Sequence, residues 1–231
     1  MAWGCPLSLV RPLDAAPHAQ QVARRVEGVE DFRASHRAAA DRENGGVETA
    51  FDTRAASLAD LDALLAHLQA GFDSYVEFAP AGWRPRSVEQ DREWIAGLLT
   101  DENTWALLAL VEREPVGHVA FFPAREHQPD DRRHWSERPL IPGLAHLWQL
   151  FVLPDWWGRG VAPLLHDAAV IEMGARGYEQ ARLYTPAAHA RARRFYERRR
   201  WSAQGEAWNQ DLALRLTEYR LMPVTRDRTR A

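Results

Sequence analysis

Residues 146–201 read HLWQLFVLPDWWGRGVAPLLHDAAVIEMGARGYEQARLYTPAAHARARRFYERRRW, and this stretch decides the fold. The apolar run 147–153 predicts a buried strand, and Pro154 ends it because proline has no N–H for a sheet ladder. A turn over residues 156–162 follows, and after it apolar residues recur at helical spacing up to the terminator Gly177. The predicted apolar face of this helix consists of Val161, Leu164, Leu165, Ala168, Ile171 and Ala175.

The turn before this helix has the composition of an anion site. The first N–H groups of a helix lack partners within the helix, and glycine lets the backbone approach an anion closely. Gly158 and Gly160 supply that freedom, and Arg159 supplies a charge. Tight packing explains a Gly-x-Gly turn equally well, and the turn lacks the lysine of a P-loop and the third glycine of a dinucleotide fingerprint.

The second half of the stretch repeats the alternation. Residues 181–185 predict a short strand that Pro186 closes, and residues 188–199 predict a helix with Ala192, Phe195, Tyr196 and Arg199 on one side. Trp201 opens the next strand. Strand, turn, helix, strand and helix in this order therefore form one continuous unit.

This unit resembles the GNAT superfamily of acyl-CoA-dependent N-acyltransferases. The family's turn, Arg/Gln-x-x-Gly-x-Gly/Ala, corresponds to Trp157-x-x-Gly160-x-Ala162. Its second signature, Asn-x-x-Ala-x-x-Phe-Tyr-x-x-x-Gly-Phe, corresponds to residues 189–201, HARARRFYERRRW. The chain departs from these patterns at Trp157, His189 and Arg200.

The resemblance implies a mixed α/β fold over residues 47–222. Its central sheet would be mixed but mostly antiparallel, splayed between the motif-bearing strands and flanked by helices. Residues 47–55 would form the first strand, and two helices between residues 57 and 99 would form one wall of the acceptor site. Residues 1–46 are expected to be a partly helical or disordered extension, and residues 223–231 a tail.

The implied activity is transfer of an acetyl group from acetyl-CoA to a primary amine of a small molecule or peptide, by direct attack in a ternary complex. Backbone groups of Leu150, Phe151 and Val152 would pair with the pantetheine arm, and backbone N–H groups of the turn would hold the pyrophosphate. The full set of cofactor residues implied by position is Leu150, Phe151, Val152, Trp157, Gly158, Arg159, Gly160, Val161, Ala162, Leu164, His189, Ala192 and Phe195.

Two residues are catalytic candidates. Tyr196 occupies the family's frequent general-acid position and would protonate the coenzyme A sulfur, although a packed tyrosine is the plainer interpretation. His146 begins the central strand and titrates near neutral pH, so it is a candidate base, with proton transfer through water as the alternative. By strand parity, His146, Trp148 and Leu150 should face one side of the sheet. The predicted acceptor-binding residues are Tyr75, Glu77, Phe78 and Trp148.

Composition limits the other possibilities. The formal charge of the 231-residue chain is −3, which gives no reason to expect nucleic-acid or membrane binding. One cysteine excludes an intramolecular disulfide, and no histidine cluster predicts a metal site. We expect a cytoplasmic protein, with homodimerisation open. Two alternatives stay open: a non-catalytic acyl-CoA-binding or regulatory module on the same fold, and a nucleic-acid-binding protein using the arginines of residues 191–200.

Overall fold

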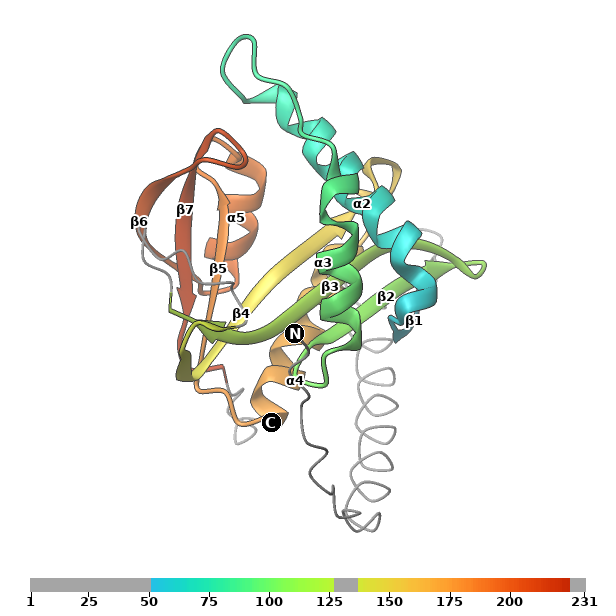
Figure 1. The fold of residues 1–231 in the computed structure, drawn as a ribbon, viewed down its shortest axis with the longest axis vertical. Helices are drawn as coiled ribbons and strands as arrows, with labels where there is room; N and C mark the ends of the chain where they lie inside the picture. Colours follow the sequence, from blue (N-terminus) through green and yellow to red (C-terminus); the bar gives the residue numbers. More distant parts are fainter. Residues whose placement is uncertain (1–50, 127–136, 225–231) are drawn as a thin grey trace, which may run out of the picture. The chain divides into compact units, whose positions relative to one another are not determined.

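A computed structural model describes residues 51–126 and 137–224 (Figure 1). The predicted extension 1–46 and most of the predicted tail 223–231 lie outside these ranges. The strands are β1 (Asp52–Ala55), β2 (Trp105–Val111), β3 (Glu114–Arg125), β4 (Leu140–Val152), β5 (Gln180–Pro186), β6 (Ser202–Asn209) and β7 (Leu214–Leu221). The α-helices are α2 (Leu61–Ser74), α3 (Arg92–Thr100), α4 (Val161–Ala175) and α5 (Ala190–Arg198), with short 3-10 turns η1 (Leu58–Asp60), η2 (Tyr75–Glu77), η3 (Val88–Asp91) and η5 (Pro154–Trp156).

The described strands form one sheet in the order β1-β2-β3-β4-β5-β7-β6. Every neighbouring pair is antiparallel except β4 and β5, which run parallel because α4 makes the crossover between them. The mixed, mostly antiparallel sheet predicted from the sequence is therefore confirmed.

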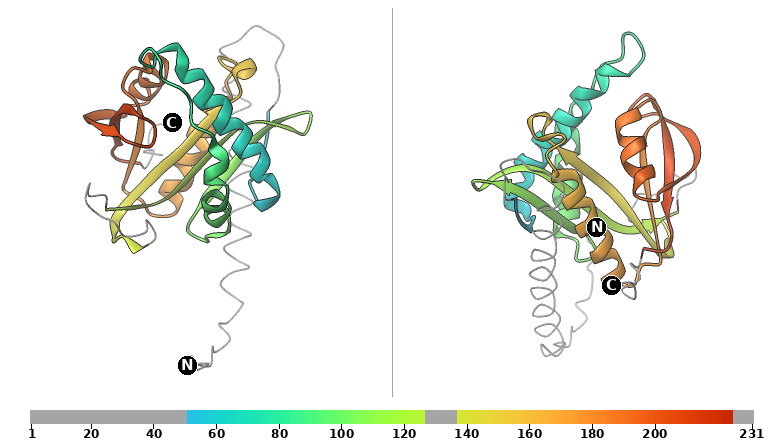
Figure 2. Two further views of the ribbon diagram at one scale, coloured as in Figure 1. Left: turned by 45° about the horizontal axis from the view of Figure 1, so that its top comes forward. Right: turned by 180° about the vertical axis from the view of Figure 1, so that it is seen from behind.

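Helices cover both faces of the sheet (Figure 2). Helices α2 and α3 pack on one face, where leucines from α2 and Ile95 from α3 bury against Leu108 of β2. Helix α4 packs on the other face against β3 and β4. Helix α5 lies beside α4, with the rings of Phe195 and His166 5.6 Å apart.

The buried face of α4 differs from the predicted one. Val161, Leu165 and Ala168 are buried as expected, together with Ala169 and Met173. Ile171 is 38% exposed and Ala175 is exposed as well, so the assignment of both to the buried face was wrong. At 100° per residue, the stripe is centred on the side of Val161, Leu165 and Ala169, which leaves Ile171 outside it.

Strand β4 is longer than its apolar run predicts. It begins at Leu140, well before the predicted run 147–153, and its first residues include Pro142 and Gly143. Pairing with β3 explains the extension, because Leu140 lies opposite Arg125 and Ala145 opposite Pro123. Tertiary pairing has overridden local propensity here.

No helix in the described ranges is long and apolar enough to cross a membrane.

Candidate active site

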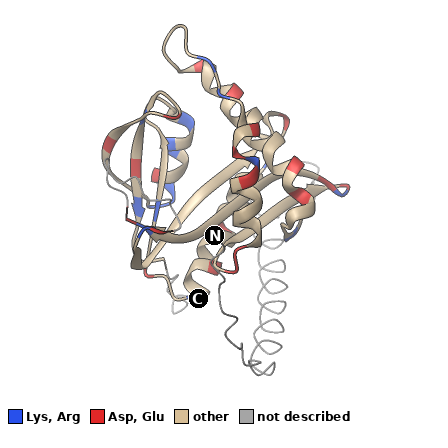
Figure 3. Cartoon of the chain, in the orientation of Figure 1, with Lys and Arg blue, Asp and Glu red and all other residues tan. Residues whose placement is uncertain are grey.

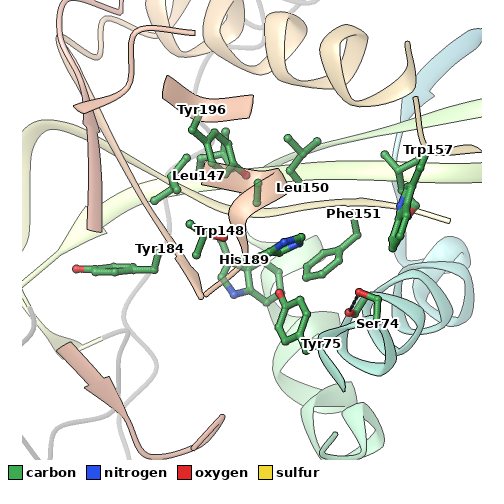
Figure 4. A pocket seen from close by; sticks show the side chains of 15 residues that line it. Ser74, Tyr75, Leu147, Trp148, Leu150, Phe151, Trp157, Tyr184, His189 and Tyr196 are labelled. Carbon is green, nitrogen blue, oxygen red and sulfur yellow. Dashed lines mark hydrogen bonds between the residues drawn. The ribbon is translucent and has the colours of Figure 1, made fainter. Parts of the chain in front are cut away.

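The two motif-bearing strands separate soon after they meet. Strands β4 and β5 pair over only three positions, Leu144–His146 against Gln180–Arg182, although β4 continues to Val152 and β5 to Pro186. A cavity of about 120 Å³ occupies the resulting gap. Helices α2 and α5 close its two sides (Figure 4). The cavity is lined by Gly71, Ser74, Tyr75, Leu147, Trp148, Leu150, Phe151, Val152, Trp157, Leu183, Tyr184, Thr185, His189, Ala192 and Tyr196.

Alternate residues of β4 turn their backbone groups toward this gap. Leu153 donates its N–H to Val116 of β3, and the Phe151 carbonyl lies against Gly117 of β3. Because backbone direction alternates along a strand, Leu150 and Val152 face the gap. Phe151 instead contributes its ring to the cavity wall, where it packs on Gly71 of α2.

A bulge in β4 sets which side chains share a face. Leu147 pairs with Phe121 and Gln149 with Ala120, so Trp148 is the extra residue. His146 and Trp148 consequently lie on the face covered by α2 and α3, whereas Leu150 pairs with Val119 and turns to the other face. The prediction that His146, Trp148 and Leu150 share one side was therefore wrong for Leu150.

The glycine turn has the backbone conformation that anion binding requires. Gly158 and Gly160 have φ angles of +79° and +93°, a region that L side chains rarely adopt. Gly160 is the N-cap of α4, and Leu164 N–H is the amide that bonds back to its carbonyl. The amides of Val161 and Ala162 precede it in the first helical turn, whereas Pro163 has no N–H. A Cβ at Gly158 would meet no atom within 4 Å, so the space before the turn is open.

Trp157 is tied to both sides of the gap. Its indole N–H donates to the Val152 carbonyl at 2.7 Å. The Arg191 guanidinium carbon lies 4.6 Å from the Trp157 ring centroid, a cation–π contact that reaches across from α5. The Val152 carbonyl, predicted to pair with the cofactor, therefore already has a hydrogen bond.

Tyr196 lies at the gap with its side chain buried. Burial, followed by the neighbouring phenol of Tyr75, raises the pKa of Tyr196, so it holds its proton at neutral pH. Among the described residues its hydroxyl has no hydrogen-bond partner. It is a protonated donor facing a cavity (Figure 4).

His189 also reaches the gap, from the start of α5. Its ring stacks on Phe78 with centroids 4.7 Å apart and meets the Tyr75 ring edge-on at 5.8 Å. Burial, and then the charge of Arg191, lowers the pKa of His189 to about 4. A neutral imidazole therefore stands where the family signature has asparagine.

The structure places His146 away from the other predicted catalytic residue. It lies opposite Arg182, where β4 and β5 are still paired, and packs between the rings of Phe122 and Tyr184. It lines neither cavity at the site. Burial, and then the charge of Arg182, lowers the pKa of His146 to about 3, which makes its imidazole a poor proton acceptor near neutral pH.

The predicted acceptor residues divide into two groups. Tyr75, Trp148 and Phe78 lie at or beside the gap, where Tyr75 packs against Phe78 with ring centroids 5.2 Å apart. Glu77 is exposed and lines neither cavity.

A second cavity, of about 560 Å³, adjoins the first at Trp148, which lines both. It lies between the α2–α3 region and the turn that joins β6 to β7. Its lining residues are Phe72, Arg86, Gln90, Asp91, Trp94, Trp148, Asn209, Asp211 and Leu212. The residues from Phe72 to Trp94 lie in the 57–99 region that was expected to form one wall of the acceptor site, but apart from Trp148 none of the lining residues was predicted individually, because only the fold brings 72–94 beside 209–212. The tryptophan at Trp94 on an otherwise ordinary helix was the one local signal.

The arginines of α5 are on its outer side. Figure 3 shows basic residues along α5, with acidic and basic residues mixed along α2 and α3. Arg191, Arg194 and Arg198 are exposed. Glu197 lies among them, within 3.9 Å of Arg193, which fits a solvated helix face better than a nucleic-acid surface.

A sheet that splays between two strands, with a glycine turn at a helix N-terminus, is the arrangement expected for the GNAT fold. Comparison with protein families agrees, since residues 68–200, more than half of the chain, match the Acetyltransferase (GNAT) family. The chain belongs to this family.

Solved structures share the fold at low sequence identity. The GCN5-related N-acetyltransferase of Rhodopseudomonas palustris is 20% identical, with a TM-score of 0.58 over 78% of this chain and 99% of its own. The PaiA N-acetyltransferase of Thermoplasma acidophilum, solved with coenzyme A, is 15% identical, with a TM-score of 0.56 over 73% and 98%. The ribosomal-protein-S18-alanine N-acetyltransferase of Escherichia coli is 15% identical, with a TM-score of 0.53 over 79% and 99%. No curated protein matches the chain.

Proposed function

We propose that the protein transfers the acetyl group of acetyl-CoA to a primary amine of a small molecule or peptide, by direct attack within a ternary complex. The observation that carries this proposal is the gap between β4 and β5, where strand edges that do not pair with each other, a helix N-terminus and a protonated tyrosine come together. Family membership and a neighbour solved with coenzyme A support the identity of the acetyl donor.

The residues of the gap fit a pantetheine arm and its pyrophosphate. The backbone of Leu150 would pair with the arm, and Val152 would do so once Trp157 releases its carbonyl. The amides from Gly158 to Ala162, at the positive end of the α4 dipole, would hold the pyrophosphate. His189, Ala192 and Phe195 lie on α5 or at its start, and the first two line the gap.

The chemistry asks for three things. The amine nitrogen must lose a proton and attack the thioester carbonyl, so that a C–N bond forms and the C–S bond breaks. The departing thiolate must then receive a proton. Tyr196 assists with the last demand as a hydrogen-bond donor: its raised pKa keeps the hydroxyl protonated, so it can stabilise the departing thiolate, which the proton released by the amine then neutralises.

The route of the amine proton is a separate part of the proposal. The low pKa of His146 and its place outside the gap favour transfer through water, with positioning of the two substrates supplying much of the rate. Replacement of His146 by Asn tests this: unchanged turnover supports the water route, and loss of turnover with unchanged acetyl-CoA affinity restores His146 as the base.

Calorimetric titration with acetyl-CoA tests the site itself. In a Gly160→Asp variant the added carboxylate repels phosphate, and the +93° φ angle is strained, so binding should fall at least tenfold. Gly177→Asp is the matched control, because Gly177 has a φ of +82° at the opposite end of α4 and open space around it. Equal acetyl-CoA binding by both variants would contradict the proposal that the turn holds the pyrophosphate.

Binding without transfer is the alternative function. The closed Trp157–Val152 hydrogen bond is the observation that favours it, because it blocks part of the strand edge. Acetyl-CoA binding with no thiol release across a broad panel of amines would support the alternative over the transferase.

A further inference from the structure

The second cavity has aromatic walls. Trp94 and Trp148 meet edge to face, with ring centroids 4.6 Å apart and planes at 82°. Phe72 of α2 adds a third ring to the lining. Aromatic faces attract cations through their quadrupole, and they attract them most strongly where water is excluded.

The charges in this cavity do not cancel. Arg86 is already paired with Asp91, and its guanidinium carbon lies 5.9 Å from the centroid of the Phe72 ring. That pair is neutral as a whole, which leaves Asp211, an exposed carboxylate at the rim, as the remaining charge in the lining. Among the described residues, Asp211 has no ion-pair or hydrogen-bond partner. The cavity therefore carries one net negative charge beside its rings.

The turn that carries Asp211 is held in place. Leu212 donates its N–H to the Asn209 side-chain oxygen at 2.8 Å. The Leu212 carbonyl accepts from the indole N–H of Trp83 at 2.8 Å, which ties the turn to the loop between α2 and α3. Asp211 is thus presented from a fixed turn, at the far side of the cavity from β4.

We infer that this cavity binds the far end of the acceptor, and that this end is a cation. The inference rests on the proposed function: the amine that reacts must be neutral and must enter the gap at Trp148, so a second, charged group is what remains in the aromatic cavity. At about 560 Å³ the cavity has the volume of an ordinary small-molecule site. The substrate class is an aminoalkyl cation.

Three pentylamines that differ only at the far end test the inference, with trimethylammonium, tert-butyl or carboxylate as the end group. Each has a single reactive amine, and the first two have the same shape. We expect kcat/KM to be at least tenfold higher for the trimethylammonium compound than for the other two. Equal values for the charged and tert-butyl compounds would overturn the inference, and a preference for the carboxylate would assign the cavity to anion recognition by Arg86.

Two variants locate the effect. Trp94→Leu should raise KM for the trimethylammonium compound about tenfold with little change in kcat. Asp211→Asn should reduce the kcat/KM ratio of the trimethylammonium compound to the tert-butyl compound about fivefold. Glu102 is an exposed carboxylate on the turn after α3, and Glu102→Gln should leave this ratio unchanged. A preference that survives Trp94→Leu and Asp211→Asn would place the far end elsewhere.

Calorimetry separates failure of this inference from failure of the transferase proposal. The trimethylammonium compound is titrated into the full chain with and without acetyl-CoA. Amine binding that Trp94→Leu weakens, without turnover, would keep the cation site and reject the transferase. Acetyl-CoA-dependent turnover of all three amines at equal rates would keep the transferase and reject the cation site.

Discussion

The Nδ1 atoms of His67 and His118 lie 3.0 Å apart in the buried layer between α2 and β3. His67 Nε2 faces the Pro115 carbonyl at 3.1 Å, so it must carry the proton, and His67 Nδ1 must then accept from His118. With His118 neutral, its Nε2 is an acceptor. The group of Gln149 that meets it at 2.9 Å is therefore the amide nitrogen, because oxygen and nitrogen of an amide are assigned from such a network.

This pair predicts acid-sensitive stability. Burial, and then the neighbouring His67, lowers the pKa of His118 to about 3, whereas an unfolded histidine titrates near 6.5. Between those values the unfolded chain binds more protons, so the free energy of unfolding falls as pH falls, by up to about 1.4 kcal/mol per pH unit for this residue. In urea unfolding between pH 7.5 and 5, His118→Leu should be less stable at pH 7.5 but should lose less stability on acidification. If the free energy of unfolding falls equally with pH in the wild type and in His118→Leu, His118 is not held neutral in the folded protein.

Tyr196→Phe tests the general acid. Removing the hydroxyl should lower kcat at least a hundredfold, the usual scale for a proton donor, while acetyl-CoA affinity stays within about twofold. Tyr219→Phe is the control, since the Tyr219 hydroxyl bonds Glu197 at 2.8 Å and lines neither cavity. Unchanged turnover in Tyr196→Phe would show that Tyr196 serves in packing and not as a proton donor.

Trp157→Phe tests the hydrogen bond that closes the gap. The variant keeps a ring for Arg191 but frees the Val152 carbonyl, so acetyl-CoA should bind about two- to tenfold more tightly, the equivalent of one net hydrogen bond. Trp156→Phe on the same turn, whose ring meets Phe51 and Arg159 instead, should bind as the wild type does. Weaker binding in Trp157→Phe would mean that the indole itself contacts the cofactor.

Gly71→Ala tests the fit between α2 and the cavity wall. A Cβ at Gly71 would lie 2.2 Å from a carbon of the Phe151 ring, so the variant should lose about 1–3 kcal/mol of stability through overpacking. Gly97→Ala in α3 meets nothing within 4 Å and should gain up to about 1 kcal/mol from helix propensity. Chemical unfolding measures both, and a gain in Gly71→Ala would show that Phe151 moves freely.

The sequence predicted what local patterns determine. The strand, glycine turn and helix around Gly160 and the helix that presents Tyr196 all appear in the structure. The face of Leu150 was not predictable, because one extra residue at Trp148 reverses the alternation and parity cannot reveal a bulge. The acceptor wall was predicted as a region, residues 57–99, but its individual residues were not, because Trp94 and Asp211 come to line one cavity only through the order of the strands.

The separation of β4 and β5 has a consequence for how the protein behaves among other chains. An exposed strand edge invites pairing with a neighbouring molecule and so promotes aggregation. Here the edge of β4 that β5 leaves unpaired lies in a cavity flanked by α2 and α5. These two helices restrict the approach of a foreign strand to this edge while a slender ligand can still lie along it.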